Sequence, residues 1–476
     1  MKYEVKIGIE SHFELLTKSK LFCGCSVEFG KPANTQCCPV CLGLPGSLPV
    51  LNRQAVNLAI KAGIATHCDI SSISGMDRKN YFYPDLSKGY QITQQNMPIC
   101  KNGYVNINDN KKIHIDKIHI EEDAGKLVYR ENNILIDYNR CGVPLIEVVS
   151  KPDMSSADEV RVYVEKLVDI MRYVGVSDCK MQEGSMRCDV NVSIKKYGSN
   201  EDGTRVELKN LNSIKFITKA IEYEVDRQIS ELEKGNKIKK ETRRYNELTK
   251  KTEAMRLKEN ESDYRYFKDP DLVDFDISKK EIDVIRSKMP EDFDARVNRY
   301  VKEYGLSMID ARNLLKYRKA SDYFDKVSKN LSNKKIVSNL ILGVFFSHLK
   351  TKEQKLNFNV SISSQELSRL CDLIEKSEIE LNFAKDAIDK ALNTNSDLQE
   401  VLNVKNITKI DEKEVELLCD KVLSCNEKAV KDYCKGKSQS IQYLIGEVLK
   451  LSKGTLTVNL AEKCLKEKLI LITKNK

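Results

Sequence analysis

The sequence predicts an α+β protein, with a mainly antiparallel sheet and its helices in the N-terminal part and helices alone in the remainder. Period-two alternation of apolar and polar residues recurs in several segments before residue 290, which is typical of strands with one buried face. From Asp294 onward, apolar residues recur at helical spacing instead, as in KIVSNLILGVFFSHL. This change of period is the main evidence for the fold class.

A chain of 476 residues is too long for one ordinary domain. We expect a mixed domain over residues 1–293, ending near the turn-forming SKMPEDF, then a helical domain over 294–405 and a helical tail domain over 406–476. The Lys-rich tail domain fits contact with nucleic acid, although solvated Lys-rich helices are the commoner explanation of such a composition.

The composition permits a nucleic-acid partner without requiring one, since 79 Lys and Arg face 70 Asp and Glu for a net charge of +9. No apolar stretch approaches the length of a membrane span, and the first residues begin directly in a strand pattern, so we expect a cytoplasmic protein without membrane contact. The sequence contains neither a P-loop nor a G-x-G-x-x-G motif, and no pattern pairs a histidine with a nucleophile.

The first predicted strand, KIGIESHFEL from Lys6 to Leu15, places Glu10 and His12 on the same face, within reach of a common ion or proton. A solvated strand face is the plainer explanation of this segment taken alone. Glu147 lies in the apolar run VPLIEVVSKPD, where a carboxylate needs a partner, and Glu122 ends the strand pattern IHIDKIHIEEDAGKL. We therefore expect Glu10, His12, Glu122 and Glu147 to form one magnesium site.

Five cysteines lie close together in LFCGCSVEFGKPANTQCCPVCLGLPGSLP. Because cysteines in a reducing compartment are mostly thiols, such a cluster indicates a metal site before a disulfide. Cys23, Cys25, Cys38 and Cys41 could bind a structural zinc, although adjacent Cys37 makes the third ligand ambiguous and unliganded thiols are the alternative.

Helices are expected after the cap Asn52, with Gly63 past the end, from Ser156 to Tyr173, and in an amphipathic stretch ending near Gly235. The segment KKETRRYNELTKKTEAMRLKENESDYRYFKDPDL has weak periodicity and resembles a binding loop more than a core element.

Cationic and aromatic residues alternate in MDRKNYFYPDLSKGYQITQQ, which suits phosphates and stacked bases as well as it suits an aromatic-rich core strand. The strand patterns SMRCDVNVSI and TRVELKNLNS, joined by the Gly- and Asn-rich YGSNEDG, predict a hairpin. Its polar face could form the floor of a phosphate or tRNA cleft or simply be solvated. The candidates for phosphate or tRNA binding in these two regions are Arg78, Lys79, Tyr81, Lys88, Arg187, Asp189, Arg205 and Lys209.

Several long segments in the same order resemble the B subunit of the bacterial tRNA-dependent amidotransferases, the GatB family. They include CPVCLGLPGSLPVLN, DRKNYFYPDLSKGYQITQ, IEEDAGKL, DYNRCGVPLIEVVSKPD, SDCKMQEGSMRCDVNVSI and ETRRYNELTKKTEAMRLKE, and the tail resembles that family's terminal domain. The resemblance spans essentially the whole chain.

This resemblance implies that the first domain is a cradle for the acceptor end of a misacylated tRNA. There ATP phosphorylates the side-chain carboxylate of Glu on tRNA(Gln) or Asp on tRNA(Asn), and ammonia then displaces the phosphate. A separate amidase (glutaminase) subunit supplies the ammonia from glutamine, and a small third subunit completes a heterotrimer. The family's magnesium site falls on Glu10, His12, Glu122 and Glu147, and its zinc site on Cys23, Cys25, Cys38 and Cys41.

A hypothesis from another class is a zinc-stabilised tRNA-binding scaffold whose partner performs all the chemistry. Burial of Glu147 together with Glu10 and His12 distinguishes the two, because a scaffold has no reason to bury them. The sequence does not decide which of the two tRNAs is used.

Overall fold

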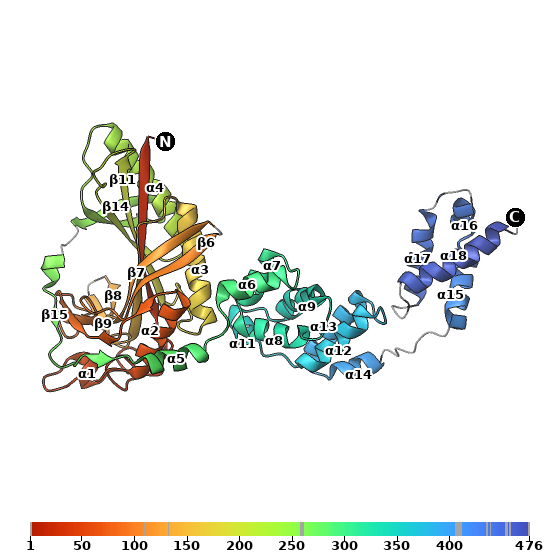
Figure 1. Ribbon diagram of the computed structural model, residues 1–476, viewed down its shortest axis with the longest axis horizontal. Coiled ribbons are helices and arrows are strands. Elements are labelled where there is room, and N and C mark those ends of the chain that lie inside the picture. The colour runs from red at the N-terminus through yellow and green to blue at the C-terminus, as the bar shows by residue number, and fades with distance from the viewer. Residues whose placement is uncertain are drawn as a thin grey trace. The chain divides into compact units, whose positions relative to one another are not determined.

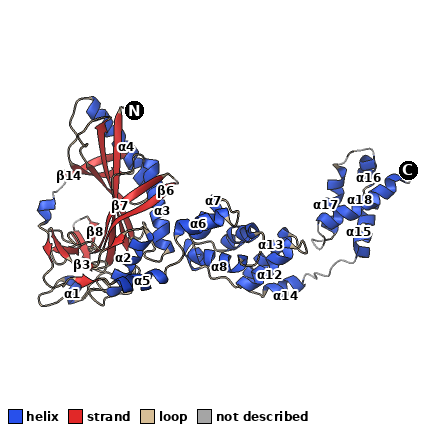
Figure 2. Cartoon of the chain, viewed as in Figure 1, coloured by secondary structure: helices blue, strands red, loops and turns tan. Residues whose placement is uncertain are grey.

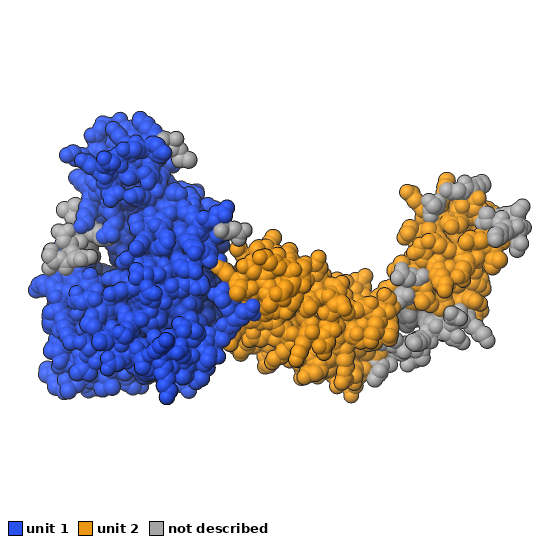
Figure 3. Space-filling view, in the orientation of Figure 1, with its two compact units in different colours: residues 1–293 blue, residues 294–476 orange. Residues whose placement is uncertain are grey.

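The computed structural model describes residues 2–474 except 109, 132, 258–260, 405–411, 435, 436, 438, 453–455 and 457. The chain divides into two compact units, residues 1–293 and 294–476, which are described separately (Figure 3). The expected boundary between residues 405 and 406 lies outside the described residues.

The first unit is built on a nine-stranded sheet (Figure 1). Its strand order is β14-β13-β12-β11-β1-β10-β7-β6-β2, and every pair is antiparallel except β12 with β13, which confirms the predicted mainly antiparallel sheet. In chain order the strands are β1 (Tyr3–Glu14), β2 (Asp69–Ile70), β6 (Cys100–Asn108), β7 (Lys111–Glu122), β10 (Pro144–Ser150), β11 (Met186–Lys196), β12 (Val206–Leu211), β13 (Glu241–Asn246) and β14 (Lys251–Leu257).

Strand β1 lies near the middle of this sheet, between β10 and β11. Ile7, Ile9 and Phe13 are fully buried, whereas Glu10 and His12 on the opposite face remain partly exposed. The period-two pattern of the sequence therefore places the apolar and polar faces of this strand correctly.

Three helices pack on the sheet: α2 (Arg53–Ala65) on β7, α3 (Ala157–Tyr173) on β6 and α4 (Ile214–Glu233) on β11. They are capped by the side chains of Asn52, Ser156 and Ser213, each accepting a hydrogen bond from a backbone N–H of the first turn. The expectation that α2 ends before Gly63 is wrong. Gly63 lies inside the helix, where a Cβ would come within 2.4 Å of the Cys100 sulfur. Glycine is therefore required at this position for close packing of α2 on β6, and it does not mark the end of the helix.

The expected binding loop after residue 238 is also different in the structure, because β13 and β14 form an antiparallel pair at the edge of the large sheet. Thr242, Tyr245 and Thr252 are buried there, so these strands contribute to the core despite their basic composition. The register of β13 shifts between Thr242 and Arg243, so the buried Thr242 and Tyr245 are three residues apart and the strand shows no regular period of hydrophobicity.

Smaller elements surround the large sheet. They are α1 (Pro39–Leu42), the three-stranded sheet of β4 (Asp77–Asn80), β5 (Tyr90–Thr93) and β15 (Phe267–Lys268), the pair β3 (Ile73–Ser74) and β16 (Phe275–Asp276), the hairpin β8 (Lys126–Arg130) and β9 (Asn133–Asp137), the short helix η1 (Glu261–Tyr264) and α5 (Lys279–Ser287).

The second unit is helical throughout its described residues, as predicted, and all described strands lie before it (Figure 2). Its elements are α6 (Phe293–Lys302), which begins at the unit boundary, α7 (Met308–Leu315), α8 (Arg318–Ser328), α9 (Lys334–Leu340), η2 (Ile341–Phe345), α10 (Phe346–His348), α11 (Lys352–Asn357), α12 (Ser364–Glu375), α13 (Leu381–Thr394), α14 (Leu398–Val404), α15 (Glu412–Cys425), α16 (Glu427–Cys434), α17 (Ser440–Leu451) and α18 (Val458–Lys474). Among the described residues, no helix combines the length and apolarity that crossing a membrane would require.

Candidate active site and cysteine cluster

A row of polar side chains crosses four neighbouring strands on one face of the large sheet. His12 on β1 is paired with Glu147 on β10 and with Arg187 on β11, and Glu147 is paired in turn with His119 on β7. Cross-strand partners project to the same face, so the sheet register alone brings these four side chains together.

His12, Glu121 and Glu147 form the centre of this arrangement, with possible ligand atoms all within 4.8 Å of one another. The Nε2 atom of His12 lies 3.5 Å from a carboxylate oxygen of each acid. His119 lies against the same acids, with its Nε2 3.1 Å from Glu147 Oε2 and 3.6 Å from Glu121 Oε2. Among the described residues, the buried Nδ1 of His119 has no hydrogen-bond partner.

The charges of this group stabilise one another. Burial opposes protonation of His12, but the Glu147 and Glu121 carboxylates outweigh it and raise the pKa of His12 to about 9. Burial would raise the pKa of Glu147, yet His119 and His12 hold that pKa well below its usual value. The acids are therefore ionised, and a cation that takes His12 as a ligand must displace its proton.

A second acidic group lies further along the same face. One carboxylate oxygen each from Glu10, Asp189 and Glu207 lie within 4.8 Å of one another. The Nζ atom of Lys209 is 3.0 Å from Asp189 Oδ2 and 3.7 Å from Glu207 Oε1, and Asn191 donates a 2.9 Å hydrogen bond to Glu10. The structure thus places Glu10 with this lysine-compensated group, next to the group of His12.

Lys79 on β4 provides a positive charge close to the ionised acids. Its Nζ lies 4.8 Å from the ring centre of Tyr264 and 5.6 Å from that of Tyr81. Burial disfavours its charge, but interactions with Tyr266, Glu121 and other neighbours raise the pKa of Lys79 above its ordinary value. The ammonium therefore stays protonated beside the carboxylates.

Glu122 lies elsewhere, in an ion pair with Lys88 of 2.6 Å, and accepts a 3.0 Å hydrogen bond from the backbone N–H of Ile92. The physical reason is the alternation of β7, in which Glu121 shares a face with His119 and Glu122 shares the other with buried Ile120. Of the expected magnesium ligands, the structure therefore groups His12 with Glu147, and Glu121 completes the set. The alternation in IHIEE places His119 and Glu121 on one face, but neither residue was among those expected from the sequence.

The three arginines among the candidates for phosphate or tRNA binding differ in whether an acid balances their charge. Arg78 forms ion pairs of 2.7 Å with Asp269 and 2.9 Å with Asp271 and stacks over Tyr90. Arg187 is 2.7 Å from Asp123, so its charge is also balanced within the chain. Arg205 is exposed immediately before β12.

The four predicted cysteines lie together, since the sulfurs of Cys23, Cys25, Cys38 and Cys41 are within 4.8 Å of one another. Cys37 is outside this group, with its sulfur 3.9 Å from Asn139 Oδ1. A tetrahedral zinc–thiolate site with Zn–S bonds of about 2.3 Å needs sulfurs about 3.8 Å apart, so the four residues fit such a metal. A hydrogen bond from the Cys23 thiol, the backbone N–H of Cys38 and the charge of Lys20 together overcome burial and lower the pKa of Cys41 to about 4.

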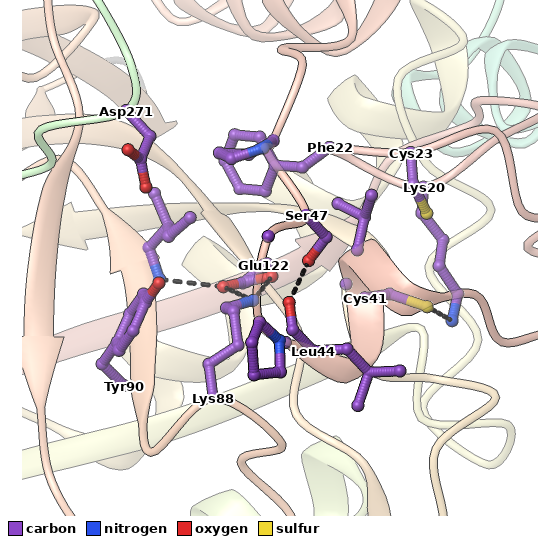
Figure 4. Close-up of a pocket in the computed structure, with 17 residues that line it drawn as sticks. Lys20, Phe22, Cys23, Cys41, Leu44, Ser47, Lys88, Tyr90, Glu122 and Asp271 are labelled. Carbon is purple, nitrogen blue, oxygen red and sulfur yellow. Dashed lines mark hydrogen bonds and ion pairs between the residues drawn. The ribbon is translucent and has the colours of Figure 1, made fainter.

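A pocket of about 220 Å³ separates the cysteines from the Lys88–Glu122 ion pair (Figure 4). Cys41 and Lys20 line one side, and Lys88, Tyr90 and Glu122 line the other. Gly43, which caps α1 with φ +69°, touches Lys88 so closely that a Cβ would come within 2.5 Å of Lys88 Cγ. The cysteine segment therefore packs directly on the lysine that holds Glu122.

Comparison with known proteins agrees with this architecture over both units. Residues 5–283 match the GatB/GatE catalytic domain, and residues 322–469 match the GatB domain. The aspartyl/glutamyl-tRNA(Asn/Gln) amidotransferase B subunit of Caldanaerobacter subterraneus subsp. tengcongensis is 47% identical over 474 residues, covering 98% of this chain and 100% of the relative.

Similar proteins of the same description occur in Caldicellulosiruptor saccharolyticus, at 46% identity over 477 residues, and in Clostridium acetobutylicum, at 43% over 474 residues. Each match covers 98% of this chain and 99% of the relative. With family models matching both of its units and full-length relatives this similar, the chain belongs to the GatB family.

Proposed function

We propose that this chain, as the B subunit of a tRNA-dependent amidotransferase, activates the side-chain carboxylate of Glu on tRNA(Gln) or Asp on tRNA(Asn). ATP phosphorylates the carboxylate, and ammonia then attacks the acyl carbon and displaces phosphate to leave Gln-tRNA(Gln) or Asn-tRNA(Asn). A free carboxylate is a poor acyl donor, and the phosphate supplies the leaving group that it lacks. The observation that carries the proposal is the group of His12, Glu121 and Glu147, held by the sheet register beside the ammonium of Lys79.

We assign His12, Glu121 and Glu147 as the residues that would hold magnesium. Two ionised carboxylates and one imidazole with donor atoms within 4.8 Å provide the hard, negatively charged surroundings that this ion requires. When bound, magnesium neutralises phosphate charge and orients the transferred phosphoryl group.

His119 acts as a positioning residue in this proposal. A ligating histidine normally donates its second ring N–H to an acceptor, and the Nδ1 of His119 has none among the described residues. Its Nε2 instead faces Glu147 and Glu121, so His119 holds the two carboxylates in place as a hydrogen-bond donor.

Lys79 is suited to stabilise the negative charge of the phosphates as the phosphoryl group moves, because its ammonium is positioned before any ligand arrives. Tyr81, Tyr264 and Tyr266 lie around it, with ring centres 5.9 Å apart for the first pair and 6.0 Å for the second. These rings are suited to exclude water or to stack on a base. Lys209 and Arg187 extend the polar face toward the acceptor end of the tRNA.

We further propose that a separate amidase subunit supplies the ammonia by hydrolysing glutamine and that a small third subunit completes the heterotrimer. The similarity to full-length B subunits over 98% of the chain supports this assembly. The four cysteines would hold a structural zinc, because four thiolates leave no open coordination position.

The test is transfer of labelled γ-phosphate from ATP to Glu-tRNA(Gln) or Asp-tRNA(Asn) by the purified complex, with magnesium and without a nitrogen donor. Wild type should label the aminoacyl-tRNA, and Glu147→Gln should not, while both bind tRNA similarly. Glu159→Gln, which removes a carboxylate of α3 that is paired with Lys111, is the matched control and should label normally. Equal labelling by wild type and Glu147→Gln would favour the scaffold hypothesis instead.

A further inference from the structure

Lys20 is a fully buried lysine that has no carboxylate partner in the part of the chain that the structure describes. It lies in the segment between β1 and the first cysteine, is 0% exposed, and ranks among the largest fully buried side chains of the described chain. Its Nζ lies 3.5 Å from the sulfur of Cys41 and 3.3 Å from the carbonyl oxygen of Tyr138, and Figure 4 shows the ammonium directed at that sulfur.

The surroundings of Lys20 differ from those of the second lysine at this pocket. Lys88 is neutralised by the Glu122 carboxylate at 2.6 Å. Lys20 has no ion pair with a carboxylate among the described residues, and one neutral carbonyl does not compensate a buried ammonium. The anion that can balance Lys20 is therefore the thiolate of Cys41.

The backbone holds this contact from several sides. The N–H of Lys20 donates a 3.0 Å hydrogen bond to the carbonyl of Cys25, so the lysine is linked to the cysteine segment at both ends. Gly142 borders the stem of Lys20, since a Cβ at this residue would lie in ordinary contact, 3.5 Å from both Lys20 Cδ and Cys41 Cβ. The lysine thus occupies a fitted slot beside the metal-ligand candidates.

We infer that Lys20 is a charge-compensating and positioning residue of the metal site, holding the Cys41 thiolate and retaining the ion. The inference rests on the proposed zinc site. Four thiolates and one Zn²⁺ carry a net charge of two minus, and the Lys20 ammonium reduces it to one minus without occupying a coordination position. A group that hydrogen-bonds a metal ligand in this way increases metal affinity, typically by 10- to 100-fold.

The test measures zinc content and the rate of zinc transfer from the full-length protein to a chromogenic chelator. Lys20→Met removes the charge and the donor, whereas Lys20→Gln removes the charge but keeps an amide that can reach toward the Tyr138 carbonyl. Both should release zinc about 10- to 100-fold faster than wild type. Lys20→Arg keeps the charge and should restore most of the retention.

The matched control is Lys111→Met, which removes an ammonium of the same unit that is paired with Glu159 and not with a cysteine. It should release zinc at the wild-type rate. Equal rates for wild type and Lys20→Gln, or equal acceleration by Lys111→Met, would overturn the role of Lys20. If Lys20→Met does not fold, Lys20→Gln decides between these outcomes.

Wild type that binds no zinc would overturn the zinc site itself, which is a distinct result. Cobalt(II) substitution provides a second readout of the ligand set, because tetrahedral thiolate coordination produces intense visible bands. The Lys20→Gln protein should show the same bands as wild type at saturating cobalt and lose them at lower chelator concentration. Altered bands at saturation would contradict a compensating role, because they would mean that the ligands themselves had changed.

Discussion

The two clusters of candidate ligands in the first unit are positioned in different ways. His12, Glu121 and Glu147 project from three neighbouring strands, so hydrogen-bond register sets their spacing and neighbouring His119 and Lys79 compensate their charge. The cysteines come from a segment whose regular structure includes the four-residue α1, and four thiolates would repel one another without a cation. We therefore expect the sheet site to be formed before an ion binds, and the cysteine segment to depend on a bound ion for its fold.

Metal dependence should separate the two regions most strongly. Cys38→Ser should lose zinc and make the segment between Phe22 and Asn52 sensitive to proteolysis, because structural zinc contributes on the order of 10 kcal/mol to folding. The adjacent change Cys37→Ser removes a thiol outside the cluster, so this variant should retain zinc and resist proteolysis like wild type. Metal analysis and limited proteolysis check this, and equal zinc loss in the two variants would remove the distinction between Cys37 and Cys38.

At the sheet site, Lys79→Met should slow phosphate transfer to aminoacyl-tRNA by about 100-fold, because a positioned charge near the phosphates is lost. Zinc content should not change. Lys101→Met, at an exposed position of β6, is the control and should transfer phosphate normally. Single-turnover labelling measures the rate, and a wild-type rate for Lys79→Met would exclude Lys79 from the reaction.

The preformed character of the sheet site can be tested at His119. His119→Gln should raise the magnesium concentration for half-maximal phosphate transfer by about 10-fold or more, with a smaller effect at saturating magnesium. His114→Gln changes an exposed histidine of the same strand and should leave this concentration unchanged. A loss of rate at all magnesium concentrations would show that His119 acts in the chemical step and is more than a positioning residue.

The smallest effect concerns stability at the end of β1. Burial and, to a smaller extent, the negative charge of Asp123 raise the pKa of Glu14 to about 7. The folded state therefore binds the proton of the Glu14 carboxyl more tightly than the unfolded state does. Stability from this group is present below pH 4.5 and is lost as pH rises toward 7. Glu14→Gln should therefore stabilise the protein at pH 8 by up to about 3 kcal/mol and have little effect at pH 4.

Urea unfolding followed by circular dichroism at the two pH values measures this difference. Glu4→Gln, on the same strand and partly exposed, is the control and should show no such pH dependence. A Glu14→Gln protein that is less stable than wild type at pH 8 would contradict the raised pKa.

The sequence predicted most of what depends on regular alternation. The two faces of β1 and the helical second unit follow directly from residue period. The antiparallel pairing of β11 with β12 follows from the Gly- and Asn-rich link YGSNEDG between them. The clustering of four cysteines was also accessible, because their short spacing limits how far apart they can lie.

The details that depend on strand phase and on distant partners were harder to predict. Choosing Glu121 over Glu122 required knowing which face of β7 meets Glu147 on β10, and burial does not decide this because both acids are buried. The grouping of Glu10 with Asp189 and Glu207 depends on strands that come much later in the chain. The contact of Lys20 with Cys41 likewise depends on how an irregular segment folds back on itself.

The most direct test of the central claim compares Glu121→Gln with Glu122→Gln in γ-phosphate transfer to aminoacyl-tRNA at saturating magnesium. The two changes are chemically identical and adjacent in sequence, but they act on opposite faces of β7. We expect Glu121→Gln to lose phosphate transfer and Glu122→Gln to retain it, with tRNA binding near wild type in both. Retained transfer in Glu121→Gln, or loss confined to Glu122→Gln, would contradict the assignment of the site to His12, Glu121 and Glu147.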